Sequence, residues 1–326
     1  MNSDLMVQRI GELKDVKQNL LAQIRKTIIG QDRVVEQVLW GLFGNGHMLI
    51  EGVPGLAKTL LISTIAKALN LSFGRIQFTP DLMPSDITGS DILISSAGGD
   101  MKQFQYIKGP IFANIILADE INRTPPKTQA ALLQAMQEYH VSSGNNTWQL
   151  DLPFIVMATQ NPIEQEGTYP LPEAQLDRFM LYINIDYPSY DEELQIVKST
   201  TGAELDSPSP LLSASQIIEY QNAVRSMPLS QHVLEYAVKL VRRTRPSNPE
   251  AEKSIQKWVS WGAGPRASQY LIIAAKAKAA LDGRLTPAED DVRAVAEPVL
   301  THRILVSFAA EAEGIKSKDI IKDILE

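Results

Sequence analysis

The residues with the clearest chemical potential are Gly-Val-Pro-Gly-Leu-Ala-Lys-Thr at positions 52–59. They differ by one methyl group from the phosphate-binding pattern G-x-x-x-x-G-K-[ST], because Ala57 stands where the pattern has glycine. In such a loop, backbone N–H groups surround an anion, the lysine reaches the terminal phosphates and the hydroxyl holds Mg²⁺. A glycine-rich turn in front of a helix is the structural alternative. We assign to a nucleotide-phosphate site the residues Gly52, Val53, Pro54, Gly55, Leu56, Ala57, Lys58, Thr59 and Leu60.

Two acids follow an apolar run about 60 residues after Lys58. The run 115–118 ends in Asp119 and Glu120. A carboxylate at the end of a strand beside a phosphate loop lies where the Mg²⁺ of a nucleotide sits. We therefore expect Asp119 and Thr59 to position Mg²⁺, which leaves Glu120 to polarise a water molecule toward the γ-phosphate. Acids that only cap a strand at the surface are the alternative.

A neutral amide, Asn161, follows the apolar run 154–159 and precedes Pro162. It can hold the attacking water without repelling phosphate, or it can simply turn the chain before the proline; both interpretations stay open here. An acid that activates water favours hydrolysis, so a small-molecule kinase is the least favoured class. The tetrapeptide Asn-Lys-x-Asp, which usually recognises guanine, does not occur. We therefore predict an adenine nucleotide.

The elements that must position these residues are strands separated by helices. Short apolar runs predict strands, and stretches such as 59–69 and 125–139 have helical spacing. Strands that alternate with helices form βαβ units around a mostly parallel sheet, and strands this apolar need helices on both faces. The predicted strands are 48–51, 72–78, 115–118, 154–159 and 182–185, and two helices, 5–27 and 32–43, precede them.

The character of the chain changes near Pro188. Strand signals end there, and capped helix starts follow, such as Ser189 with Glu192 and Ser213 with Gln216. We therefore divide the chain into an α/β domain over 1–188 and an all-helical domain over 189–326.

Composition excludes several function classes. The chain of 326 residues has 38 acidic and 31 basic residues, a net charge of −7, which argues against a general nucleic-acid binder. It has no cysteine, which excludes disulfides and a cysteine nucleophile and agrees with a cytoplasmic location. The first residues lack the apolar core of a signal peptide, and no run of 18 apolar residues predicts a membrane span.

The ordered motifs resemble those of the AAA+ ATPases and, more closely, of their MoxR branch. The resemblance covers about 28–281 and rests on segments 52–59, 117–123, 158–162, 171–179 and 264–268. In that branch alanine before the loop lysine is usual. The resemblance implies a P-loop NTPase fold, in which helices sandwich a parallel sheet and a helical lid domain follows, and it implies ATP and Mg²⁺ as cofactors.

The resemblance also assigns roles to individual residues. Ile29 and Gly30 match the segment that lines the adenine pocket, and Asn161 matches the sensor of the lytic water. Arg178 matches the arginine finger, which acts on the nucleotide of a neighbouring subunit. Arg266 matches a second sensor on the lid, and whether it acts on its own subunit or on a neighbour stays open. An arginine in the first turn of a helix also opposes the helix dipole, which favours an anion close to it.

Two insertions, 92–112 and 141–152, are expected to face a substrate. The second is expected to form a hairpin; it contains Trp148 and neither lysine nor arginine, which favours a protein over a phosphate backbone. Local packing of Trp148 is the alternative. We expect a homo-oligomer, hexameric by resemblance, that remodels or activates a partner protein in the manner of a chaperone. The family implies metal insertion and von Willebrand factor A partners. The alternatives are a nucleic-acid motor of the same fold and a nucleotide-controlled switch with little turnover.

Overall fold

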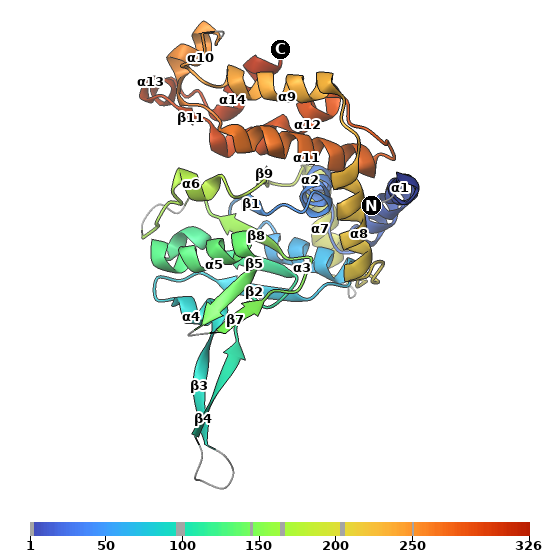
Figure 1. Ribbon diagram of the computed structural model, residues 1–326, viewed down its shortest axis with the longest axis vertical. Helices are drawn as coiled ribbons and strands as arrows, with labels where there is room; N and C mark the ends of the chain where they lie inside the picture. The colour runs from blue at the N-terminus through green and yellow to red at the C-terminus, as the bar shows by residue number, and fades with distance from the viewer. Residues whose placement is uncertain (1–2, 96–101, 144–145, 164–166, 203–205, 250) are drawn as a thin grey trace.

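The computed structural model describes residues 3–95, 102–143, 146–163, 167–202, 206–249 and 251–326. A helical region is stacked on a body built around one main sheet, and a long hairpin extends from the opposite end of that body (Figure 1). The hairpin, the sheet and the helical region therefore follow one another along the longest axis.

The main sheet is parallel and has five strands in the order β2-β5-β8-β1-β9. All five strands expected from the sequence are confirmed. Because parallel strands end at a common edge, the segments after β1, β5 and β8 meet at one side of the sheet. The strands are β1 (Met48–Glu51), β2 (Phe73–Gln77), β5 (Ile115–Asp119), β8 (Ile155–Gln160) and β9 (Leu181–Asn184).

The central strands are buried on both faces. In β5, Ile115 and Leu117 belong to one apolar cluster, whereas Ile116 and Ala118 belong to the other. This alternation follows from the two-residue period of a strand, and it explains why the run contains no polar residue before Asp119. The first cluster packs against α1 (Ser3–Ile24), α2 (Asp32–Phe43) and α3 (Lys58–Ala68), and the second against α5 (Pro126–Glu138).

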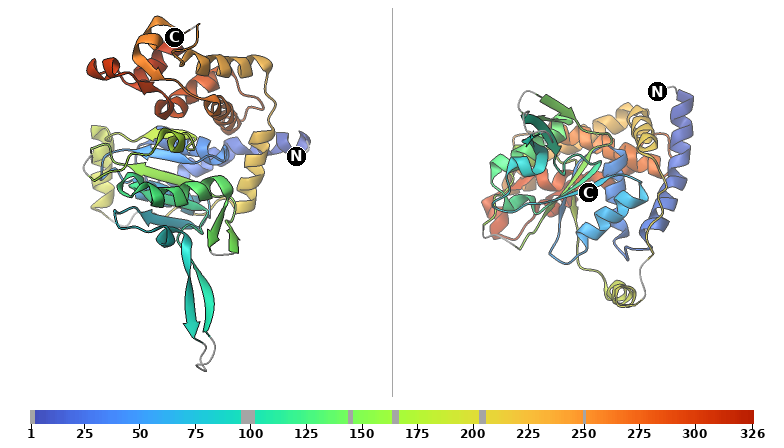
Figure 2. Two further views of the ribbon diagram at one scale, coloured as in Figure 1. Left: turned by 60° about the vertical axis from the view of Figure 1, so that its left-hand side comes forward. Right: turned by 90° about the horizontal axis from the view of Figure 1, so that it is seen from below.

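Two hairpins interrupt the α/β order. The expected hairpin at 141–152 is present as β6 (His140–Ser143) and β7 (Asn146–Gln149). The insertion at 92–112 forms the longer antiparallel pair β3 (Gly89–Ser95) and β4 (Lys102–Lys108), preceded by α4 (Pro84–Thr88). This second hairpin extends far from the body (Figure 2). The dipeptide Gly98-Gly99 lies outside the described residues.

The region after 188 is mainly helical, as expected, but it is not wholly so. It contains a short antiparallel pair, β10 (Val259–Trp261) with β11 (Leu305–Val306). The expected caps at Ser189 and Ser213 are both present as capping boxes. The helices are α7 (Tyr190–Thr200), α8 (Ala214–Ser226), α9 (Gln231–Arg243), α10 (Lys253–Trp258), α11 (Pro265–Leu281), α12 (Glu289–Leu300), α13 (Phe308–Ala312) and α14 (Ser317–Leu325), and a short α6 (Glu173–Leu176) precedes β9.

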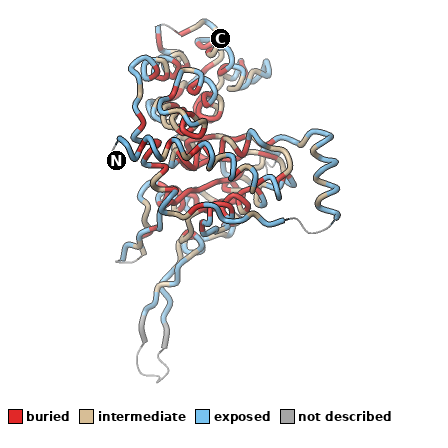
Figure 3. Tube along the Cα trace, turned by 90° about the vertical axis from the view of Figure 1, so that its right-hand side faces the viewer, coloured by how far each residue is buried: buried red, intermediate tan, exposed pale blue. Residues whose placement is uncertain are grey.

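The two regions share apolar packing. The cluster that covers one face of the sheet continues through α1 and α2 into α8, α11 and α12, and buried residues run continuously from the sheet into the helical layers (Figure 3). The helix α7, yellow-green in the right-hand view of Figure 2, stands apart from this core, and it has no buried residue. Within the described residues no helix has both the length and the apolar character that crossing a membrane requires.

Candidate nucleotide site

The loop between β1 and α3 has the backbone of a phosphate-binding loop. Gly55 has φ +88° and Ala57 has φ +53°, both in the left-handed region. This conformation explains the glycine of the general pattern, because a side chain there costs about 1–2 kcal/mol. Gly52 approaches the chain after β9 so closely that an added Cβ would lie 2.9 Å from the carbonyl oxygen of Ile185. The strand–loop–helix arrangement expected from the sequence is therefore present.

Lys58 begins α3, and its amine is folded back onto the loop. Its Nζ donates hydrogen bonds to the carbonyl oxygens of Gly52 (2.5 Å) and Val53 (3.1 Å). Burial lowers the pKa of this amine, and the charges of Asp119, Glu120 and Glu51 oppose the shift. The ammonium is thus half-buried among carbonyls and carboxylates at the centre of the candidate site.

The two expected acids lie at the end of β5, held by Thr159 of the neighbouring strand β8. The Thr159 hydroxyl donates to Asp119 Oδ1 (2.7 Å) and accepts from the backbone N–H of Glu120 (2.9 Å). Thr159 is fully buried and Asp119 is 8% exposed. One hydroxyl therefore fixes both the carboxylate expected to face the metal and the backbone of the expected base.

Three further polar residues hold the same acids, and sequence analysis did not single them out. Arg75 Nη2 donates to Asp119 Oδ2 (2.7 Å). Gln77 Nε2 and Arg123 Nη1 donate to Glu120 Oε2, each at 3.0 Å. Arg123 lies inside a quoted motif, and its spacing of three residues from Glu120 is a detectable signal. Arg75 and Gln77 stand on β2, and no local pattern links them to the acids.

Asn161 follows β8 directly and therefore lies at the same edge of the sheet. Its Oδ1 accepts a hydrogen bond from the backbone N–H of Ile163 at 3.2 Å. That contact is the turn anticipated as the alternative to a role with water. Position supports the first interpretation and the hydrogen bond the second, and the two are compatible, because the amide also carries a nitrogen donor.

A pocket of about 370 Å³ adjoins the phosphate loop, and neither Asp119 nor Glu120 lines it. It joins Ile29, for which the resemblance predicts a role in adenine binding, to Leu56, Ala57 and Leu60. Its third wall was not anticipated, and it consists of Ile196, Val197 and other residues of α7, preceded by Tyr187 and Pro188. Gly30 has φ +70° beside this pocket, and an added Cβ would collide with the Glu192 side chain at 2.3 Å.

The two expected arginines line the same cavity, and this cavity lies at the edge of the sheet where the strands begin, opposite the phosphate loop. Arg178 and Arg266 line one cavity of about 150 Å³, together with His47 and Tyr270. His47 precedes β1, and the N–H of Met180, at the start of β9, donates to its carbonyl oxygen at 2.7 Å. The cavity is therefore separated from the phosphate loop of the same chain by the length of β1, about 13 Å at ~3.3 Å per residue.

Both arginines have partners at that edge. Arg178 Nη1 donates to the carbonyl oxygen of Leu133 (2.6 Å), and Arg266 Nη1 lies 3.3 Å from Asp177 Oδ2. The second oxygen of Asp177 accepts from Arg303 Nε at 2.7 Å. Asp177 therefore places a carboxylate beside the first turn of α11 and pairs with Arg266 and Arg303, whereas Arg178 donates to a backbone carbonyl.

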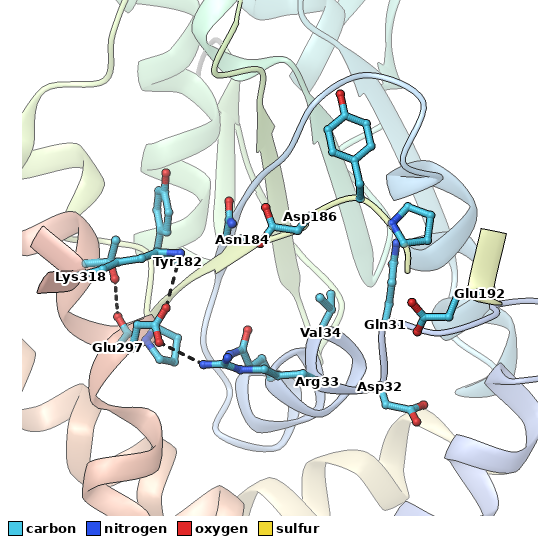
Figure 4. Close-up of a pocket in the computed structure, with 15 residues that line it drawn as sticks. Gln31, Asp32, Arg33, Val34, Tyr182, Asn184, Asp186, Glu192, Glu297 and Lys318 are labelled. Atoms are coloured by element: carbon cyan, nitrogen blue, oxygen red, sulfur yellow. Dashed lines mark hydrogen bonds and ion pairs between the residues drawn. The ribbon is translucent and has the colours of Figure 1, made fainter. Parts of the chain in front are cut away.

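A second polar groove separates the sheet edge from the last helices. It has a volume of about 360 Å³ and lies among the start of α2, the end of β9, α12 and α14. Figure 4 shows Glu297 of α12 between Arg33 and Lys318, at 3.0 and 3.5 Å. No residue of the phosphate loop lines this groove. The half-exposed ion pairs of this groove contribute little to stability. Apolar packing therefore holds α12 and α14 to the rest of the molecule.

The oxygen donors at the phosphate loop fit Mg²⁺. Mg²⁺ takes one or two protein oxygens together with phosphates, and Asp119 and Thr59 supply a carboxylate and a hydroxyl there. Elsewhere in the described part of the chain, no cluster of three or more histidine, aspartate or glutamate residues forms an all-protein metal site.

Comparison with known proteins defines the class. Residues 47–181 match the ATPase family associated with various cellular activities (AAA), and residues 251–324 match the AAA lid domain. The chain is 42% identical to the chaperone MoxR1 of Mycobacterium tuberculosis over 93% of its own length and 79% of that protein. It is 26% identical to the protein MoxR of Methylorubrum extorquens, over 97% and 94% of the two lengths. The chain belongs to the AAA ATPases.

A solved structure supports the same assignment along the whole chain. A protein of Cytophaga hutchinsonii superimposes with a TM-score of 0.90 and 40% identity, over 98% of this chain and 96% of that one. Within the AAA ATPases, the chain is a member of the MoxR branch. The resemblance of the ordered motifs is thereby confirmed.

Proposed function

We propose that this chain hydrolyses ATP at a site shared between two subunits of a ring and uses the cycle to remodel a partner protein. One observation carries the proposal: Arg178 and Arg266 lie together at the edge of the sheet opposite Lys58 and Glu120. Neither arginine can serve the phosphate loop of its own chain across a sheet. In a head-to-tail ring, the arginine edge of one subunit meets the loop edge of the next, and the family resemblance implies six subunits.

The chain's own residues divide the chemistry among them. Backbone N–H groups of 52–59 bind the phosphates, and Lys58 exchanges its two carbonyl partners for phosphate oxygens. Glu120 accepts the proton of the attacking water, which Asn161 orients. When bound at Asp119 and Thr59, Mg²⁺ neutralises charge on the phosphate oxygens.

The arginines of the adjacent subunit complete the site. A guanidinium is always charged and can contact two phosphate oxygens at once, so Arg178 stabilises negative charge on the transferring phosphoryl group. Arg266 stands beside Arg178 and approaches the same nucleotide, which supports action on a neighbour rather than on its own subunit. Asp177, held by the buried Arg303, keeps Arg266 in place.

A protein is the partner class that the surface supports. The β3–β4 hairpin presents exposed apolar side chains far from the core, including Leu93 (50% exposed) opposite Phe104 (71%). Exposed apolar groups fit a protein surface better than a phosphate backbone. Trp148 does not extend this surface, because its ring stacks on that of Tyr106 in the longer hairpin, with 4.8 Å between the ring centroids. This is the local packing considered as the alternative for Trp148. The related MoxR1 is named a chaperone.

Chaperone-like activation in the cytoplasm is the form of function that follows. A partner with a von Willebrand factor A domain, and metal insertion into it, are the specific forms that the family resemblance implies. A nucleic-acid motor is the second candidate, and stimulation of ATPase activity by DNA with a steep salt dependence would favour it.

Complementation between two inactive variants tests the shared site. Lys58→Ala removes the lysine of the loop, and Arg178→Ala removes the arginine of the opposite edge, so each alone should be nearly inactive. Co-assembled in equal amounts, they should regain about a quarter of wild-type activity, because random mixing pairs two intact edges in about a quarter of the interfaces.

The control is Arg242→Ala, which removes an exposed arginine at the end of α9 and should keep wild-type activity. If the mixed assembly stays inactive, or if activity per subunit is independent of concentration in a monomer, the shared site is wrong. A nucleotide-controlled switch would instead show tight ATP binding with negligible turnover in every preparation.

A further inference from the structure

The polar residues of β2 form an unassigned connection between the two acids of the site. Arg75 Nη2 donates to Asp119 Oδ2 and to Gln77 Oε1, both at 2.7 Å. Gln77 Nε2 in turn donates to Glu120 Oε2 at 3.0 Å. One guanidinium nitrogen therefore touches the metal-side acid and also orients the amide that holds the expected base.

The position of Arg75 makes it a competitor for a cation. Thr159 already occupies Asp119 Oδ1, so Oδ2 is the oxygen left to face a ligand, and Arg75 takes it. The Arg75 side chain is 48% exposed, whereas that of Asp119 is 12% exposed. An ion pair with one half-exposed member is weak, so Mg²⁺ carried in with a nucleotide can displace it without unfolding the strand.

We propose that Arg75 is a positioning residue that neutralises Asp119 in the nucleotide-free chain and is displaced when Mg²⁺ and nucleotide bind. Displacement also removes the donor from Gln77 Oε1. Because β2 is an edge strand of the sheet, the displaced guanidinium reaches solvent without crossing the core.

The inference rests on the proposed function and is tested by the dependence of nucleotide binding on Mg²⁺. The probe is a fluorescent N-methylanthraniloyl derivative of ATP bound to the full chain, with free Mg²⁺ titrated from a chelated start. In Arg75→Gln the competing charge is absent, so the Mg²⁺ concentration for half-maximal binding should fall about fivefold. Arg75→Lys keeps a positive charge and should stay nearer to wild type.

Two controls separate competition from general electrostatics. Arg123→Gln removes another arginine of the site, one that contacts Glu120 rather than Asp119, and should change the Mg²⁺ requirement by less than about twofold. In an Asp119→Asn background, Arg75→Gln should have no further effect on Mg²⁺, because the disputed carboxylate is gone. Circular dichroism and a melting curve verify that each variant is folded.

An unchanged or raised Mg²⁺ requirement in Arg75→Gln overturns the inference, as does an equal effect in Arg123→Gln. The proposed function fails in a different way: the wild-type chain would then bind the ATP derivative without any dependence on Mg²⁺, or would not bind it.

Discussion

At the scale of single residues, the site depends on pairs of neighbours in different strands. Thr159 joins Asp119 to the backbone of Glu120, and Glu120 itself has φ +57°, an uncommon backbone for a residue with a side chain. Such a conformation persists only where surrounding contacts hold it, and here the Thr159 hydroxyl and two side-chain donors do so. The carboxylate is thus held between Gln77 of β2 and Arg123 of the turn that follows β5.

Replacement of Glu120 by glutamine should separate binding from turnover. The amide has the same shape, so ATP affinity should stay within about threefold of wild type, whereas loss of a general base should lower turnover at least about 100-fold. Steady-state phosphate release and binding of a fluorescent ATP derivative measure the two quantities. Glu138→Gln, an exposed acid at the end of α5, serves as the control, and full turnover in Glu120→Gln would assign the base elsewhere.

At the scale of elements, α7 is the helix whose role packing alone does not explain. It has no buried residue, and its apolar side chains Tyr190, Leu194 and Val197 are 77%, 42% and 52% exposed. Of these, only Val197 lines the pocket beside the phosphate loop. The helix therefore lines the pocket beside the phosphate loop and contributes no buried residue to the core.

A charge placed on that wall should weaken nucleotide binding. Val197→Asp puts a carboxylate into an apolar pocket that is expected to hold adenine, and we expect affinity for the ATP derivative to fall about tenfold. Leu194→Asp is the matched control, because it makes the same change on the same helix outside the pocket. Equal loss in both variants would mean that α7 acts through its stability rather than through contact with the base.

At the scale of the whole molecule, a buried histidine joins the sheet to the arginine edge. His47 Nε2 lies 3.0 Å from the carbonyl oxygen of Met136, and Nδ1 accepts from the N–H of Val156 at 3.0 Å. Burial lowers the pKa of His47 from 6.5 to about 4. The folded chain therefore needs this ring neutral, and the ring links β8 and α5 beside the cavity of Arg178 and Arg266.

The fold should consequently lose stability in mild acid. His47 takes up a proton near pH 6.5 in the unfolded chain and only near pH 4 in the folded chain. The stability that the neutral ring contributes is therefore complete above pH 6.5 and is lost as the pH falls toward 4. Between pH 7 and 5 the loss from His47 should be about 2 kcal/mol in the free energy of unfolding. Urea titrations at several pH values measure the free energy of unfolding, and His47→Gln should flatten its pH dependence by that amount. An equal slope in His47→Gln would contradict the assignment.

Much of the fold could be predicted from local pattern. The five strands and the helices at 32–43 and 59–69 follow from the spacing and number of apolar residues in short segments. These features depend only on residues that are neighbours along the chain. The loop at 52–59 and the acids at 119–120 were predictable for the same reason, since each motif is contiguous and ends a strand. The helical region was also predicted, but the strands β10 and β11 are two or three residues long and pair across more than 40 positions.

What the amino-acid sequence determined by itself is the chemistry of the loop, its acids and the class of fold, because these depend on residues adjacent along the chain. The tertiary structure decided which side chains meet. The order of parallel strands brings Arg75 to Asp119 across 44 positions. The packing of α11 against the chain before β9 brings Arg266 to Arg178 at the edge away from the loop. His47 precedes β1 and Lys58 follows the loop after it, so the two residues lie beyond opposite ends of that strand. Only the assembled parallel sheet gathers the starts of its strands at one edge and their ends at the other.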